Sequence, residues 1–223
     1  MSMVENLVIP DPEEKYPVET AWQMTYIRPT LTRSNIIVGD YSYFADADFD
    51  SHVTHHYDFL GDKLVIGKFC QIAKGVEFIM NGANHQMNCV STYPFYIFGW
   101  NTNPPELSDL PIKGDTVVQN DVWIGQNSTI LPGCNIADGA IVGANSTVAS
   151  DVEPYTIVAG NPAKFVRRRF DNELTALLLE LKWWDLPYKK VAEILPLLNN
   201  SKYSDLEYEK QEIQKLVEQL RNT

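Results

Sequence analysis

Aliphatic residues recur at every sixth position in the second half of this 223-residue chain. The unbroken run consists of Val118, Ile124, Ile130, Ile136, Val142 and Val148. Four positions after each of these the residue is small or slim: Val122, Ser128, Cys134, Ala140, Ser146 and Val152. An earlier run follows the same rule at Ile66, Ile72 and Phe78, with Cys70, Val76 and Gly82 at the fourth offset. A period of six fits neither an amphipathic helix nor a simple strand alternation.

This period predicts a β-solenoid in which short strands alternate with tight turns. One aliphatic side chain per hexad would point inward and stack on its equivalent in the next coil. The small residue would fill the corner of the coil, where a large side chain does not fit. Cys70 and Cys134 both fall on this corner position, so we interpret them as packing residues rather than nucleophiles or metal ligands. Cys89 lies off the pattern and has no assignment.

Two segments interrupt the hexads, at about residues 43–63 and 83–115, and both are rich in aromatic residues. Long insertions in compact folds are usually functional or disordered, and their aromatic content argues against disorder. Insertions in repeat proteins gather on one face, which is often the binding face. Two interpretations stay open. The aromatic rings line a site for a bulky, mostly apolar ligand, or they attach the loops to the solenoid or to a neighbouring subunit.

Helical spacing replaces the hexads towards the C-terminus. A first helix is predicted by Phe170, Leu174, Leu177, Leu178 and Leu181, with Asp171 as its cap and Trp183, Trp184 and Pro187 at its end. A last helix is predicted from Ser204, with Glu207 completing a capping box and Ile213, Leu216, Val217 and Leu220 as its apolar stripe. We expect these helices to cap the solenoid or brace a trimer. The chain thus divides into a β-helix domain, 1–170, and a helical extension, 171–223.

Composition narrows the possible partners and the compartment. The chain carries 18 Lys and Arg against 29 Asp and Glu, a net charge of −11, so its surface repels nucleic acid. The apolar runs are too short to span a membrane, and the acidic, proline-containing stretch 1–16 does not resemble a signal peptide. Three cysteines, an odd number, indicate reduced thiols. We therefore predict a cytoplasmic protein that binds neither nucleic acid nor membrane.

A set of motifs occurs in a fixed order between about residues 26 and 190: "GDYSY", "DKLVIGKFC", "FIMNGANH", "STYPF", "LPIKGDT", "NDVWIG", "GNPA" and "KWW". This set resembles the hexapeptide-repeat acyltransferases, which fold as left-handed parallel β-helices. Within them it is most similar to the xenobiotic acetyltransferase family, and there to the streptogramin A (virginiamycin) acetyltransferases. The resemblance implies a homotrimer with active sites between subunits, acetyl-CoA as the donor, and no metal. Gln119 and Ala137 depart from the glycine usual at these positions.

His85 closes the motif "FIMNGANH" and corresponds to the catalytic histidine of the family. Transfer of an acetyl group to a hydroxyl needs a base that takes the proton, and imidazole suits that task near neutral pH. The alternative interpretation is that His85 is a hydrogen-bonded polar residue with no catalytic role. Two interpretations of Asn81 and Asn84 stay open. They position the imidazole ring or the acceptor, or they only stabilise the backbone turn. The resemblance adds Tyr43, Tyr57, Leu110 and Pro111 to the acceptor pocket.

The donor is polyanionic, and the chain's dense basic cluster is Lys164, Arg167, Arg168 and Arg169, directly after "AGNPA". The resemblance assigns the pantetheine arm and the phosphates to this stretch, which includes Asn161 and Pro162. Guanidinium groups match phosphates well, although a solvated charge run is the alternative. Small residues would let the arm lie close to the backbone: Gly143, Ala144, Ala159 and Gly160. Trp123 should point outward and form a wall between subunits.

His52, His55 and His56 raise the alternative of a metal enzyme. Some β-solenoids hydrate carbon dioxide with zinc held by three histidines, two of which follow the position of His85. This chain has no histidine after His85, so we interpret the three as loop residues and predict no metal.

Together these features predict an acetyl-CoA-dependent O-acetyltransferase that inactivates a hydroxyl-bearing antibiotic, with streptogramin A (virginiamycin M type) favoured as acceptor. Two alternative activities are a type B chloramphenicol acetyltransferase and an O-acetyltransferase of small alcohols or sugars. A third alternative, from another class, is a non-catalytic β-helix assembly subunit. The joint presence of His85 and the basic cluster argues against that third alternative, because a scaffold needs neither.

Overall fold

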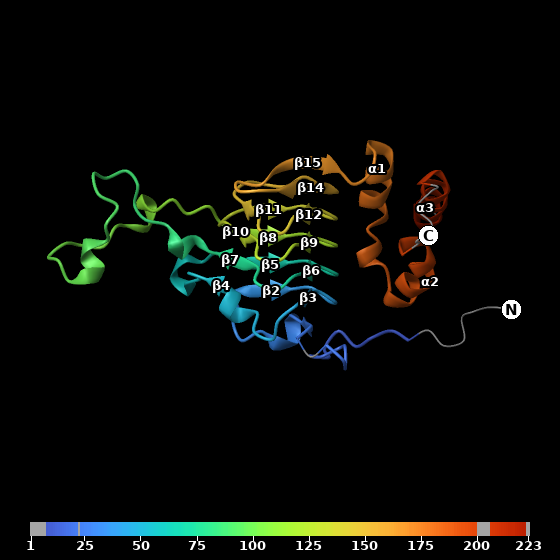
Figure 1. Ribbon diagram of the computed structural model, residues 1–223, viewed down its shortest axis with the longest axis horizontal. Helices are drawn as coiled ribbons and strands as arrows, with labels where there is room; N and C mark the ends of the chain where they lie inside the picture. Colours follow the sequence, from blue (N-terminus) through green and yellow to red (C-terminus); the bar gives the residue numbers. More distant parts are fainter. Residues whose placement is uncertain (1–7, 22, 200–205, 222–223) are drawn as a thin grey trace.

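Short parallel strands stack into a column of coils in the computed structural model, which describes residues 8–21, 23–199 and 206–221 (Figure 1). One sheet has the order β1-β3-β6-β9-β12-β14-β15, a second β13-β10-β7-β4, and a third β11-β8-β5-β2. Pairing is parallel throughout, except that β1 and β15 run antiparallel at the two ends of the first sheet. The prediction of a hexapeptide β-solenoid is confirmed as a parallel β-helix with three sheets.

The strands are two to five residues long, as the hexad pattern requires. Their bounds are β1 Thr25–Tyr26, β2 Ile36–Val38, β3 Tyr43–Phe44, β4 Val53–Thr54, β5 Leu64–Ile66, β6 Gln71–Ile72, β7 Glu77–Ile79, β8 Thr116–Val118, β9 Trp123–Ile124, β10 Thr129–Ile130, β11 Asn135–Ile136, β12 Ile141–Val142, β13 Thr147–Val148, β14 Thr156–Ala159 and β15 Lys164–Arg168.

The aliphatic hexad positions form three buried columns, one per sheet. Ile72, Ile124 and Val142 are in register in the first sheet and continue to Val158. The equivalent columns of the other sheets are Phe78, Ile130 and Val148, and Val38, Ile66, Val118 and Ile136. All of these side chains are buried. Each contributes about 1.5–3 kcal/mol of transfer free energy, so the core grows coil by coil.

The small residues occupy the corners, as predicted. Ser128 shows why a short side chain suits this position, because its hydroxyl donates to the Gly143 carbonyl at 2.9 Å. Cys70 is fully buried, and burial raises the pKa of its thiol to about 12. A thiol with so high a pKa is a poor nucleophile, in agreement with the packing role inferred for it. All three cysteines are free thiols.

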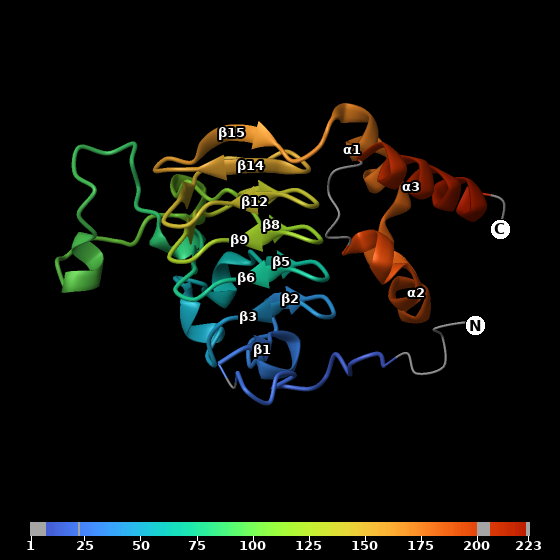
Figure 2. The ribbon, with the colours of Figure 1, turned by 45° about the vertical axis from the view of Figure 1, so that its right-hand side comes forward.

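Three α-helices lie beside the coils rather than across their end (Figures 1 and 2). They are α1 Asn172–Leu181, α2 Tyr188–Leu198 and α3 Leu206–Arg221. The Asp171 carboxylate accepts a hydrogen bond from the Leu174 amide at 2.8 Å, which confirms the predicted cap of α1. Leucines of α1 pack against Ile213, Leu216 and Val217 of α3. The predicted start at Ser204 lies outside the described residues.

The helix α2 was not predicted, because a proline after a helical pattern indicates an end as readily as a start. In the structure Lys182 ends α1 with a left-handed φ of 42°, and Pro187 directly precedes α2. Proline is tolerated at a helix N-terminus because the first amides have no partner within the helix. The 3-10 helix η7, Trp183–Asp185, joins the two helices, and Trp184 is buried there.

The prediction of an insertion over 43–63 is wrong in its bounds. Strands β3 and β4 lie inside this range and pair with β6 and β7 of the coils. The hexad signal fails here because Phe44 takes an inward position usually held by an aliphatic residue. The short 3-10 helices η2 Asp50–His52 and η3 Asp58–Leu60 flank β4.

After β7 the chain leaves the coils and returns only at β8. This segment, 80–115, contains the 3-10 helices η4 Asn81–Ala83, η5 Phe95–Phe98 and η6 Leu107–Asp109. It projects far from the column, in green at the left of Figure 1. We call residues 80–115 the projecting loop.

Candidate active site

The projecting loop begins in close contact with the coil below it. The Gly82 amide donates to the His55 carbonyl at 3.0 Å. A Cβ on Gly82 would lie 2.4 Å from that carbonyl oxygen and 2.4 Å from the ring of Tyr57. Any side chain at this position would push the two segments apart, so glycine fixes how the chain enters the loop.

His85 follows three residues later and is exposed. Its Nδ1 lies 2.8 Å from the Thr92 carbonyl oxygen. A carbonyl oxygen only accepts hydrogen bonds, so in the neutral ring Nδ1 carries the proton and Nε2 carries the lone pair. Among the described residues, Nε2 has no hydrogen-bond partner. The geometry therefore presents a histidine whose free nitrogen is a base.

His85 lines a cavity of about 770 Å³ between the projecting loop and the segment around η3. Most of the lining surface is apolar, and polar side chains such as Asn81, Asn84 and Gln86 interrupt it. The larger rings and aliphatic side chains in it are those of Tyr57, Phe59, Leu60, Tyr93, Phe95, Tyr96, Ile97, Leu107 and Leu110. Such a lining suits a bulky organic molecule that bears few polar groups.

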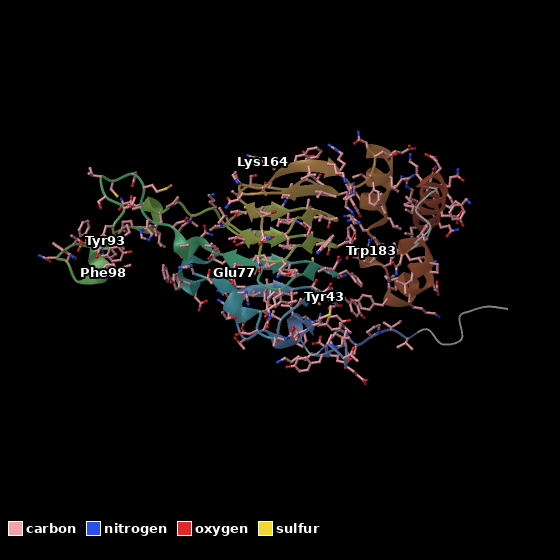
Figure 3. The ribbon with its side chains drawn as sticks, viewed as in Figure 1. Tyr43, Glu77, Tyr93, Phe98, Lys164 and Trp183 are labelled. Atoms are coloured by element: carbon pink, nitrogen blue, oxygen red, sulfur yellow. The ribbon has the colours of Figure 1, made fainter. Side chains whose placement is uncertain are left out.

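The aromatic residues of the projecting loop contact one another yet stay exposed. Tyr93 stacks on Phe98 with centroids 5.2 Å apart, and Phe95 meets Trp100 edge-on at 5.6 Å. Phe98 and Trp100 are both 62% exposed. Figure 3 places Tyr93 and Phe98 at the far end of the loop, away from the coils. Exposed apolar surface of this kind is typical of a contact with another molecule.

Four of the residues assigned to the acceptor pocket line the cavity with His85: Tyr57, Asn81, Asn84 and Leu110. Tyr43 and Pro111 are not among the lining residues of this chain. Tyr43 lies half-buried in β3, and burial raises the pKa of its phenol. Pro111 contributes its carbonyl, which accepts from Asn84 Nδ2 at 3.0 Å. Phe59 and Leu60 were not assigned, although their place in the first aromatic segment was a signal for them.

Three residues of the basic cluster lie in the strand β15, at the end of the first sheet, and Arg169 follows it directly. Lys164, Arg167 and Arg168 are exposed there. The Arg168 guanidinium also donates to Asn172 at 3.1 Å and lies 3.4 Å from Glu153. Figure 3 shows Lys164 above the coils. The three side chains can therefore reach a polyanion from the surface.

Arg169 differs from its neighbours because its guanidinium is used inside the protein. It donates to the Gly139 carbonyl at 2.6 Å, lies 3.6 Å from the Asp121 carboxylate, and sits over the ring of Tyr155. Burial raises the pKa of the Asp121 carboxyl, an effect that the Arg169 charge counteracts. Arg169 is thus a structural residue that joins β15 to the coils.

Small residues gather beside β15. A Cβ on Gly143 would lie 2.9 Å from the Ala159 methyl group, so only glycine leaves the surface flat at this point. Gly160 has a φ of 100°, a conformation that favours glycine, and its amide donates to Ser146 Oγ at 3.0 Å. Ala144 lies against Gly125. Asn161 and Pro162, which are joined by a cis peptide bond, follow Gly160.

Trp123 points outward, as predicted, and is 49% exposed. Strand register places it in a row with Ile141, Ile157 and Arg167 on the outer face of the first sheet. The row leads from a large aromatic ring to the basic strand.

Within one chain the structure shows no direct contact between the two halves of the candidate site in its described residues. Among the described residues, no hydrogen bond or ion pair joins His85 to β15. Figure 3 shows Lys164 over the coils, whereas Tyr93 and Phe98 of the histidine-bearing loop extend away from them.

The histidines of the first aromatic segment have separate surroundings. His52 packs on Phe44 and its Nδ1 lies 2.8 Å from Glu77. His56 is buried, with Nε2 2.8 Å from the Asp62 carbonyl oxygen. In the described part of the chain, no group of three or more His, Cys, Asp or Glu residues could hold a metal ion. Nor does any described helix have the length and apolar character to cross a membrane.

Comparison with known proteins identifies the relatives of this chain. Residues 115–150 match the family described as "Bacterial transferase hexapeptide (six repeats)". A "Probable macrolide acetyltransferase" from Lysinibacillus sphaericus is 56% identical over 68% of this chain and 86% of its own length. A "Virginiamycin A acetyltransferase" from Staphylococcus aureus is 47% identical over 86% and 89%. A "Chloramphenicol acetyltransferase" from Agrobacterium fabrum is 42% identical over 77% and 86%.

Proposed function

Because the chain belongs to the xenobiotic acetyltransferases of the hexapeptide-repeat family, and is thus an acetyltransferase, we propose that it acetylates a hydroxyl group of an antibiotic with acetyl-CoA as donor. We further propose a streptogramin A of the virginiamycin M type as the acceptor. The observation that carries the reaction type is His85, whose Nδ1 is bound to the Thr92 carbonyl while Nε2 stays free at an apolar cavity.

In this proposal His85 is the general base. Acetyl-CoA, when bound, supplies an acetyl group activated as a thioester. His85 Nε2 accepts the proton of the acceptor hydroxyl as its oxygen attacks the thioester carbonyl carbon. The carbon–sulfur bond then breaks, and CoA leaves as the free thiol after its sulfur takes the proton back from the ring. The Thr92 carbonyl keeps the ring in the tautomer that has the lone pair on Nε2, and it stabilises the positive charge that develops on the ring. The acceptor itself is the nucleophile, so no serine or cysteine of the protein needs to react.

The residues on and beside β15 fit a CoA molecule. Lys164, Arg167 and Arg168 would bind its phosphates, because guanidinium and ammonium groups form strong charge-assisted hydrogen bonds with them. The flat surface at Gly143 and Ala159 would let the pantetheine arm lie against the backbone. Further contacts along the arm would come from Trp123, Ala144, Gly160, Asn161 and Pro162.

The complete site requires a second subunit, and we propose a homotrimer of left-handed β-helices. Among the described residues no hydrogen bond or ion pair joins His85 to β15, which is consistent with this assembly. The exposed rings of Phe98 and Trp100 support it, as does the exposed row that begins at Trp123. A neighbouring subunit would cover these apolar surfaces and bring its own β15 to the projecting loop. The free thiols support a reducing, cytoplasmic environment.

The acceptor is the finer part of the proposal. The size and apolar lining of the cavity favour a bulky acceptor with few polar groups. A relative named for virginiamycin A aligns over most of this chain. Chloramphenicol is the second candidate, because relatives named for it are 40–42% identical.

The test is a coupled assay that follows free thiol release from acetyl-CoA. Virginiamycin M, chloramphenicol, a macrolide and galactose are offered in turn to the purified protein. We expect turnover with virginiamycin M and a product heavier by one acetyl group. Faster turnover with chloramphenicol or the macrolide would contradict the proposed acceptor and would leave the proposed reaction type intact. No thiol release with any hydroxyl compound would overturn the proposed activity.

A further inference from the structure

A carboxylate is buried beneath the projecting loop, and the mechanism does not use it. Asp62 lies just before β5 and is 4% exposed. Its Oδ2 accepts from Asn81 Nδ2 at 2.7 Å and from the Asn81 amide at 3.2 Å. Its Oδ1 has no hydrogen-bond partner among the described residues, and the nearest cation candidate, His56 Nε2, is 4.0 Å away. Burying a carboxylate with one oxygen unsatisfied is costly, so its presence calls for a reason.

Asn81 connects this carboxylate to both ends of the projecting loop. Its Nδ2 also donates to the Gly114 carbonyl at 2.8 Å, and its Oδ1 accepts from the Lys113 amide at 2.8 Å. Both amide protons are therefore donated, and the side chain is 1% exposed. Asn81 joins the segment that leaves the coils to the segment that returns, 33 residues later. Asn84 adds a second link of this kind through Pro111.

The coils hold Asp62 firmly. The Asp62 carbonyl oxygen lies 2.8 Å from His56 Nε2. The next residue, Lys63, accepts from the Thr116 amide at 2.9 Å through its carbonyl and donates its own amide to Asp115 at 2.8 Å. The series Asp62, Asn81 and Gly114 thus runs from the rigid column to the base of the loop.

His85 has no such attachment of its own. Its bond to Thr92 is internal to the projecting loop, so it orients the ring relative to the loop and not relative to the coils. The location of Nε2 relative to β15 of a neighbouring subunit then depends on how the loop is attached at its base.

We propose that Asp62 is a positioning residue for the acetyl transfer. Through Asn81 its carboxylate clamps both ends of the projecting loop and thereby sets the location of His85. The proposal rests on the proposed role of His85 as the base. It differs from a purely structural role, because loss of the clamp should lower turnover in protein that is still fully folded.

The test compares two Asp→Asn variants at carboxylates that each accept from the backbone amide and the side-chain amide of one asparagine. Asp138 Oδ1 accepts from the amide and from Nδ2 of Asn120, each at 2.9 Å, and this pair lies within the coils away from the cavity. Asp138→Asn is therefore the matched control for Asp62→Asn. Melting temperature, oligomeric state, kcat and KM for acetyl-CoA are measured for both variants well below their melting temperatures.

We expect Asp62→Asn to lower kcat by about 10–10²-fold, the scale of a misplaced catalytic group, and to leave KM for acetyl-CoA unchanged. Asp138→Asn should retain wild-type kcat, whatever its melting temperature. Hydrogen exchange provides a readout that does not depend on activity. The Lys113 amide should exchange faster in Asp62→Asn and not in Asp138→Asn.

Equal kcat values in the two variants, or an unchanged Lys113 amide, would overturn the positioning role. A wild-type protein without any acetyl transfer would instead refute the proposed function, and the exchange data would still decide whether Asp62 clamps the loop.

If Asp62→Asn does not fold, the double variant Asp62→Asn/Asn81→Asp takes its place. It exchanges donor and acceptor, so the bond between positions 62 and 81 is kept while the donor to Gly114 is lost. We expect this protein to fold with low kcat. Wild-type kcat in the double variant would contradict the proposal.

Discussion

Replacing His85 with alanine should leave the protein folded and remove most of its turnover. The ring is exposed, and the structure gives it one hydrogen bond, to the Thr92 carbonyl. Loss of such a bond costs about 0.5–1.5 kcal/mol. For a chain of 223 residues, 1 kcal/mol corresponds to a fall in melting temperature of about 2–4 °C.

The expected loss of turnover is far larger, about 10²–10⁴-fold, the usual range for removal of a general base. The separation between a small stability effect and a large kinetic effect is the decisive feature.

His52→Ala is the matched control. His52 packs on Phe44 and lies against Glu77, and the cavity does not include it. This variant should lose stability and keep its turnover. Melting temperature by calorimetry and thiol release from acetyl-CoA are measured on the same preparations. A folded His85→Ala protein with near wild-type turnover would refute the assignment of the base.

Three further predictions concern the donor, the core and the assembly. The double variant Arg167→Ala/Arg168→Ala should raise KM for acetyl-CoA and weaken the dependence of KM on salt concentration. Arg169→Ala should mainly lower the melting temperature. Equal effects of the two variants on KM would show that the phosphates of CoA bind at another site. Burial raises the pKa of the Cys70 thiol from 9.0 to about 12, so its contribution to stability is present below pH 9 and is lost as the pH rises towards 12, by about 1.4 kcal/mol per pH unit. Cys70→Ser, which does not titrate, should flatten this alkaline decline in thermal melts, and an unchanged decline would exclude Cys70 as its cause. Sedimentation at micromolar concentration should find a trimer, and Trp123→Arg should shift it to smaller species; a wild-type monomer would rule out a site between subunits.

The coils were predictable because the hexad is a local code. Each side chain's inward or outward direction follows from its place in the hexad, and the register of Ile72, Ile124 and Val142 follows from the repeat itself. The prediction failed where the code is not local. Val53 takes the inward position of β4 but follows Phe44 by nine residues, so it falls outside the period of six. Pro187 has the same sequence signal at the end of one helix as at the start of another.

The candidate site was predictable in part for a related reason. His85 was found from its motif, and Tyr57, Asn84 and Leu110 do line the cavity beside it. Its partner could not be found in this way, because the Thr92 carbonyl is a backbone group that every residue type provides. Asp62 and Asn81 are 19 residues apart, and their contact depends on how the loop closes. Motif spacing therefore points to the proposed base, and the structure is needed to identify what holds it.

The acidic surface and the basic strand β15 together limit where CoA could bind in the proposed assembly. The net charge of −11 opposes the approach of a polyanion such as CoA, so binding depends on a local excess of positive charge. The exposed Lys164, Arg167 and Arg168 provide that excess on β15. The proposed base, His85, lies on the projecting loop, and among the described residues no hydrogen bond or ion pair joins it to β15. In the proposed homotrimer the projecting loop of one subunit would reach β15 of another and bring the donor to the base. This contact would also cover the exposed rings of Phe98 and Trp100.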